Sequence, residues 1–156
     1  MELAEILKAA PHFASLSAED LEAVASAITV EEYPDKHAFI RQGDRGTAVF
    51  VVVEGKVAVS AAHLGATHEL GVLGPGELFG LIALVDSEPR SATCSAVGKC
   101  RVGSLASAAA ALLFNQRAPV ACTFQMALAL QIAKDFRRLE RALRDHLDAS
   151  TRAPAV

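Results

Sequence analysis

The chain has 156 residues, 52% of them hydrophobic, and a formal net charge of −3, which fits one ordinary domain and gives no general reason to expect nucleic-acid or membrane-surface binding. Its three cysteines have no C-x-x-C spacing, which argues against a secreted disulfide framework and favours the reducing cytoplasm. Residues 1–10 mix charged and apolar positions, so we expect no signal peptide, and no run is long enough to predict a membrane span.

The first predicted helix follows a capping signal. Residues 17–20 read Ser-Ala-Glu-Asp, with Leu16 before them and Leu21 after them in the positions of a hydrophobic staple. We therefore expect a helix from Ala18 to about Ile28, preceded by a partly apolar segment over residues 7–16.

Residues 29–73 alternate short β-rich runs with turn residues, a pattern typical of a small antiparallel roll. The predicted strands are Thr29–Tyr33, Ala38–Arg41, Ala48–Val53, Lys56–Ser60 and Glu69–Leu73. Because only Glu54 and Gly55 separate the third and fourth runs, we expect a tight hairpin there. Two later strands, Ser91–Val97 and Cys100–Leu105, are expected to complete the roll.

Between these strands, residues 75–93 combine a glycine turn, a predicted one-turn helix and one arginine, and we call this segment the cassette. Backbone N–H groups at a helix start lack intrahelical partners and attract anions. Gly80 leaves room for a close approach, and Arg90 carries a planar fork of donors suited to phosphate. The cassette therefore predicts an anion site, and the alternative is that Arg90 forms a surface ion pair with Asp86 or Glu88.

The cassette resembles the phosphate-binding cassette of the cyclic nucleotide-binding domain family, which reads roughly F-G-E-x-A-L-x-x-x-x-P-R-S/A-A. The matching residues are Phe79, Gly80, Ala83, Leu84, Pro89, Arg90, Ser91 and Ala92. The likeness continues in the roll at Ile40, Gly43, Phe50 and Gly55. It implies a mainly β fold, a jelly-roll-like antiparallel β-roll with N-terminal helices and a long C-terminal helix. It also implies cyclic AMP or cyclic GMP as the ligand.

The ligand-binding residues that the resemblance implies are Phe79, Gly80, Leu81, Ile82, Ala83, Arg90, Ser91 and Ala92. Leu81 stands where the family has a glutamate that accepts a hydrogen bond from the ribose 2′-hydroxyl, and leucine offers no acceptor. One such bond to a charged group contributes about 1.5 to 3 kcal/mol. The other interpretation is therefore that Leu81 fills the pocket and closes its ribose end.

After the roll, residues 106–114 favour helix, and a longer helix is predicted from about Pro119 to Leu147. Its apolar residues recur three or four apart. Within them Ile132, Phe136, Leu139 and Leu143 fit heptad positions, so this half either pairs with a partner helix, as the family's dimers imply, or packs back onto the roll. The resemblance also suggests Gln131, Lys134 or Asp135 as contacts for the base.

We expect one domain over residues 1–156: N-terminal helices at 1–28, the roll at 29–105, C-terminal helices at 106–147 and a tail at 148–156. The nine tail residues leave no room for a helix-turn-helix, so no DNA-binding domain is expected. Acidic residues intersperse the arginines of the last helix, which favours a solvated face over a nucleic-acid surface.

The histidines lie in separate segments, with only His63 and His68 near each other, so neither a cupin-type metal site nor a metal cofactor is predicted. No G-x-S-x-G elbow is present, so we expect no enzyme. The sequence favours a cytoplasmic regulatory module that binds a cyclic nucleotide or a related anion and signals through its last helix. The alternative is a ligand-free fold that acts as a dimerisation or protein-interaction scaffold.

Overall fold

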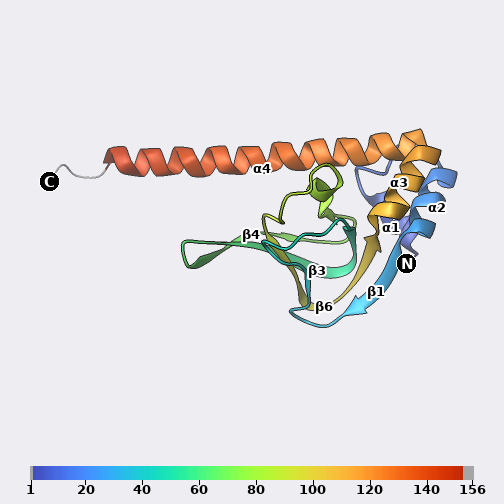
Figure 1. Cartoon of the computed structure of the whole chain (residues 1–156), viewed down its shortest axis with the longest axis horizontal. Helices are drawn as coiled ribbons and strands as arrows, with labels where there is room; N and C mark the ends of the chain where they lie inside the picture. The colour runs from blue at the N-terminus through green and yellow to red at the C-terminus, as the bar shows by residue number, and fades with distance from the viewer. Residues whose placement is uncertain (1, 153–156) are drawn as a thin grey trace.

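The computed structural model describes residues 2–152 and places a six-stranded antiparallel sheet, rolled on itself, beside two N-terminal and two C-terminal helices (Figure 1). This confirms the predicted mainly β class with flanking helices. In chain order the elements are α1 Leu3–Ala9, α2 Ala18–Ala27, β1 Thr29–Tyr33, β2 Ala38–Ile40, β3 Val49–His63, β4 Ala66–Leu73, β5 Leu78–Phe79, the 3₁₀ helix η1 Leu81–Leu84, β6 Thr93–Leu105, α3 Ser107–Gln116 and α4 Ala118–Arg152.

The hairpin predicted at Glu54-Gly55 is wrong, because β3 runs through this point as one strand. Both halves of β3 pair with β6, and the register shifts on either side of Glu54. Gly55 has φ +89°, and a Cβ on it would lie 2.8 Å from the Cβ of Cys100. The glycine therefore marks a bulge that bends a long strand, a role that looks the same in sequence as a turn.

Other boundaries also differ from the prediction. The two last strands are one, β6, which bends at Gly98, where φ is +70°. The last helix does not end at Leu147: α4 continues to Arg152, and the hydroxyls of Ser150 and Thr151 donate to backbone carbonyls of the preceding turn. Residues 148–152 of the predicted tail are therefore helical, and residues 153–156 lie outside the described residues.

The hydrophobic core has two layers, one on each face of the rolled sheet. One fills the space between the roll and the helices, where Phe13 and Phe124 meet edge to face with ring centroids 5.6 Å apart. The other fills the inside of the roll with residues such as Val52, Val57 and Val102. Because strand side chains alternate between faces, successive residues of β3 supply the two layers in turn.

The α3–α4 elbow at Arg117 is anchored on α2. Ser17 caps α2 by accepting the N–H of Asp20 at 3.1 Å, as the capping signal predicts. The guanidinium of Arg117 donates to Asp20 at 3.0 Å and to Glu19 at 3.1 Å. Two acids in the first turn of α2 thus hold the single residue that separates α3 from α4.

The helix α4 packs against the molecule only in its first part and then projects along one side of it, past the tip of the β3–β4 hairpin (Figure 1). Its buried residues end at Leu128. The predicted interface residues Ile132, Phe136, Leu139 and Leu143 are exposed, Leu139 by 69%. The alternative that this stripe packs back onto the roll is therefore wrong for this chain alone. Within residues 2–152, no helix is both long and apolar enough to cross a bilayer.

Candidate functional site

The cassette turns sharply between β5 and η1. Gly80 has φ +80°, in the left-handed region that side chains other than glycine rarely adopt. A Cβ at this position would lie 3.0 Å from the carbonyl oxygen of Ala48 and 3.1 Å from Nη1 of Arg90. The lack of a side chain at Gly80 therefore allows both the sharp turn and the close approach of the Arg90 guanidinium.

Arg90 is held by main-chain groups on two sides. Its Nη1 donates to the carbonyl of Gly80 at 3.2 Å, and its Nη2 donates to the carbonyl of Ala48 at 3.0 Å. Its own backbone is clamped to the β2–β3 loop, because its N–H donates to Asp44 O and its carbonyl accepts the N–H of Gly43, both at 2.8 Å. The cassette and the β2–β3 loop thus fix the guanidinium together.

Within residues 2–152, Arg90 forms no ion pair, and the predicted alternative pairs with Asp86 or Glu88 do not form, although the charge of Asp86 acts on the guanidinium from a greater distance. The carboxylate of Asp86 instead accepts the backbone N–H of Glu88 at 3.4 Å. Partial burial lowers the pKa of Arg90, since desolvation disfavours its charged form. Burial also raises the pKa of the Cys94 thiol to about 11, so near pH 7 this neighbour is neutral.

Leu81, in contrast to Arg90, lies in an apolar environment. Its side chain is only 4% exposed and belongs to the core cluster that joins the roll to the helices, together with Phe124 and Leu128. It lines a cavity of about 300 Å³ between the α1–α2 loop, the β4–β5 turn and α4. Gln131 and Lys134 line the same cavity, whereas Asp135 accepts the Gln131 amide at 2.9 Å. We call this space the helix cavity.

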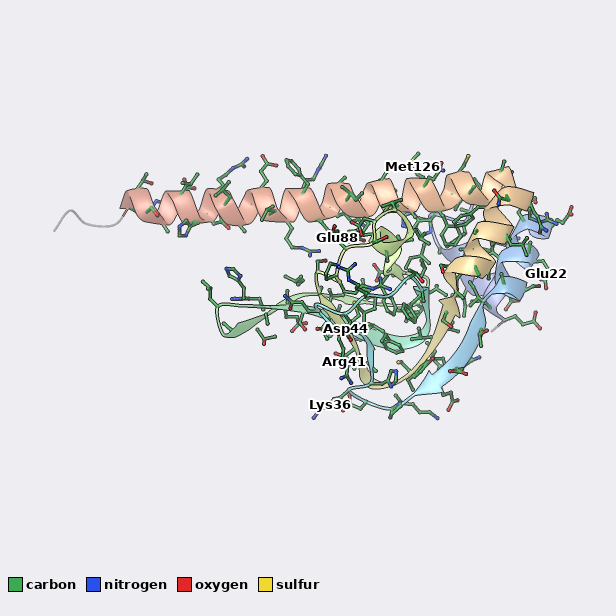
Figure 2. The ribbon with its side chains drawn as sticks, in the orientation of Figure 1. Glu22, Lys36, Arg41, Asp44, Glu88 and Met126 are labelled. Atoms are coloured by element: carbon green, nitrogen blue, oxygen red, sulfur yellow. The ribbon has the colours of Figure 1, made fainter. Side chains whose placement is uncertain are left out.

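A second cavity, of about 240 Å³, is lined by Arg90, and we call it the arginine cavity. Its wall includes Arg41 and Asp44, which lie close together on the roll in Figure 2. Arg45 completes the basic part of this wall and donates to the carbonyl of Ser87 at 2.7 Å. The rings of Phe39 and Phe50, with centroids 6.0 Å apart, supply the apolar part.

The predicted site residues do not gather in one cavity. Only Arg90 lines the arginine cavity, and only Leu81 lines the helix cavity. Phe79 is buried inside the roll with its ring stacked on Phe50 at 5.0 Å, Gly80, Ile82, Ala83 and Ala92 are partly buried, and Ser91 is exposed. The assignment of these residues to a ligand stays a prediction.

Sequence reasoning missed Arg41 and Arg45. Their only signal is a pair of arginines that flanks the turn residues Gly43 and Asp44. Nothing in that pattern says that the loop lies against the cassette, more than forty residues later in the chain, as the Arg45–Ser87 hydrogen bond shows. Among residues 2–152, no three side chains of His, Cys, Asp or Glu are grouped so that they could hold a metal ion.

The sequence of this chain is similar to a known family model and to known proteins. Residues 30–117 match the model of the cyclic nucleotide-binding domain. The chain is 39% identical over 92 residues to the cyclic AMP receptor protein of Thermus thermophilus. This match covers 58% of this chain and 43% of that protein. It is 36% identical over 88 residues to the cAMP-dependent protein kinase regulatory subunit of Mycosarcoma maydis, over 56% of this chain and 17% of that protein.

The three-dimensional fold is also similar to that of a solved relative. The crystal structure of the Thermus thermophilus catabolite activator protein superposes with a TM-score of 0.76 at 31% identity, over 89% of this chain and 63% of that one. The chain spans less than half the length of the two curated relatives named above. The family model, the sequence match and the fold agree, and the chain belongs to the cyclic nucleotide-binding domain family.

Proposed function

We propose that this chain is a non-enzymatic sensory module that binds cyclic AMP, cyclic GMP or a related anionic effector through Arg90 and signals through α4. The observation that carries the proposal is the half-buried guanidinium of Arg90, which has no ion pair within residues 2–152 and borders a cavity. An unpaired, partly desolvated cation is costly, and a bound phosphate would offset that cost. The relatives named for cyclic AMP support the choice of ligand.

The cassette is in direct contact with α4. The cassette helix η1 packs directly against α4, and Leu81, Ile82 and Leu84 contribute to the same core cluster as Leu128. A ligand that draws the cassette toward or away from the roll therefore changes the surface on which α4 rests. By linkage, the ligand biases the packing of α4 only by the difference in its affinity for the two arrangements.

The test is calorimetric titration of the purified chain with cyclic AMP and cyclic GMP up to millimolar concentrations. Arg90→Gln should weaken binding by about tenfold to 150-fold, the range for hydrogen bonds to a charged group. Arg141→Gln, which removes an exposed arginine of α4, is the matched control and should bind as the unaltered chain does. Equal affinity in Arg90→Gln and the control would contradict the role of Arg90.

A second candidate function is a protein-interaction scaffold. It is favoured by one observation, the exposed stripe formed by Ile132, Phe136, Leu139 and Leu143 on the projecting part of α4. Exposed apolar residues at heptad spacing are typical of a helix that pairs with another helix. The two candidates are compatible, because a paired α4 can also carry the signal of a sensory module.

A further inference from the structure

The arginine cavity carries more positive charge than a cyclic mononucleotide can neutralise. Of the residues that line it, three are arginines, Arg41, Arg45 and Arg90, and one is acidic, Asp44. Within residues 2–152, none of these guanidinium groups forms an ion pair with any carboxylate. A cyclic mononucleotide has one phosphate and one negative charge, so even with the carboxylate of Asp44 counted, one cation would remain uncompensated.

Two of the three arginines are already oriented. Arg90 is fixed by the carbonyls of Gly80 and Ala48, and Arg45 is fixed by the carbonyl of Ser87. A guanidinium has five N–H donors, so each keeps donors that can bind phosphate oxygens. Arg41 directly follows β2, is exposed and lines the same cavity. Fixed donors lose less conformational entropy on binding than mobile ones do.

The cavity has little with which to recognise a ribose. Leu81, at the position of the family's ribose acceptor, lines the helix cavity instead. Glu77 has one carboxylate oxygen engaged by the N–H of Gly74 at 2.7 Å and does not line the arginine cavity. Among the lining side chains, the hydroxyl of Thr47 donates to Ser107 at 3.0 Å, and Asp44 is the one carboxylate.

An apolar surface adjoins the cations. The rings of Phe39 and Phe50 line the cavity and are both partly exposed. A planar base can pack on such rings while its phosphates meet the arginines, because aromatic stacking tolerates any base. Charge and shape together therefore fit a nucleotide with several phosphate charges.

From this cavity we infer that the effector is a nucleoside diphosphate or a similar polyanionic nucleotide, recognised by Arg41, Arg45 and Arg90 through its charge and not through its ribose hydroxyl. A nucleoside diphosphate carries about three negative charges near pH 7, because the last phosphate ionisation has a pKa of about 6. That charge is enough to offset the net positive charge that the three guanidinium groups and the carboxylate of Asp44 leave in the cavity. The inference rests on the proposed function, since it uses the same Arg90, and it names the ligand class of that site.

The experiment titrates ADP, inorganic pyrophosphate and cyclic AMP into the unaltered chain by calorimetry, at two salt concentrations and without divalent metals. We expect ADP to bind at least tenfold more tightly than cyclic AMP, and we expect added salt to weaken ADP more than cyclic AMP. In the double variant Arg41→Gln/Arg45→Gln, the ratio of the two affinities should fall to near one. The double variant Arg137→Gln/Arg141→Gln removes the same charge from α4 and should keep the ratio.

The outcomes separate this inference from the proposed function. If cyclic AMP binds in an Arg90-dependent manner and ADP binds no more tightly, the inference is wrong and the proposed function stands. If ADP binds through the three arginines and cyclic AMP does not bind, the inference stands and the cyclic ligand is wrong. If Arg90→Gln changes the affinity of no ligand, both are wrong.

Discussion

The side chains of Arg90 and Leu81, nine residues apart in the cassette, occupy contrasting environments. A charged residue is half-buried without an ion pair among residues 2–152, while the position that the family uses for a polar contact is packed into apolar core. The first arrangement is stable because main-chain carbonyls accept the guanidinium donors. The second makes the side chain at position 81 part of the folded core.

That burial gives a prediction for Leu81→Glu. The introduced carboxylate would replace a side chain that is 4% exposed, so we expect a loss of unfolding free energy on the order of 3 kcal/mol at pH 7. Burial would raise the pKa of that carboxyl above its unfolded value. Protonation then favours the folded state, so the loss should shrink as the pH falls from 7 toward 4.

Urea unfolding at both pH values measures this, with Leu81→Met as the control. Methionine conserves volume and apolar character and should cost less than about 1.5 kcal/mol. Unchanged stability in Leu81→Glu would mean that the side chain can turn out of the core toward the cassette. In that case the ligand role that the resemblance implies for position 81 would regain support.

At the scale of elements, the long strand β3 depends on one residue. Gly55 adopts φ +89° in the bulge, with the carbonyl oxygen of Lys99 3.0 Å and the Cβ of Cys100 2.8 Å from where a Cβ would stand. A side chain there meets both an unfavourable backbone conformation and a main-chain neighbour that cannot move easily. The bulge allows β3 to bend and pair with β6 over most of its length.

We therefore expect Gly55→Ala to lower the unfolding free energy by roughly 3 kcal/mol and the urea midpoint by about 1 M or more. The matched control is Gly71→Ala in β4, since that glycine has no positive φ and nothing within 4 Å of an added Cβ. It should change stability little. Equal midpoints for the two variants would show that the bulge can relax without cost.

The elements also show what the sequence could and could not predict. Residue types and periodicity located most of the strands and helices, because alternation and helical spacing are local properties, but they did not predict the two-residue strand β5. They could not distinguish the bulge at Gly55 from a turn, since both need a glycine with positive φ and only long-range pairing with β6 decides between them. Arg90 was found because a motif surrounds it. Arg41 and Arg45 were missed because their contact with the cassette exists only in the folded chain.

At the scale of the whole molecule, the exposed stripe of α4 predicts self-association. Pairing would remove Ile132, Phe136, Leu139 and Leu143 from water, and buried apolar surface contributes about 25 cal/mol per Å². Light scattering should therefore give a mass near twice the 16.3 kDa of one chain at sufficient concentration. Leu139→Asp should return the protein to a monomer, because it places a charge in the paired surface.

The control for this substitution is Leu112→Asp, which introduces the same charge at an exposed leucine of α3, away from the stripe. It should leave the mass unchanged. A monomer for the unaltered chain over the accessible concentration range would contradict self-association through α4 and would leave the stripe for a different partner.

The elbow at Arg117 gives α4 the mechanics of a lever. At about 1.5 Å per residue, its 35 residues span about 52 Å. A rotation of roughly 10° about the elbow therefore moves its far end by about 9 Å, while the first turn moves by about 1 Å. Such a rotation is small enough at the elbow to preserve the ion pairs of Arg117 with Glu19 and Asp20. At Arg152 the same rotation gives a displacement as large as the distance between packed helices.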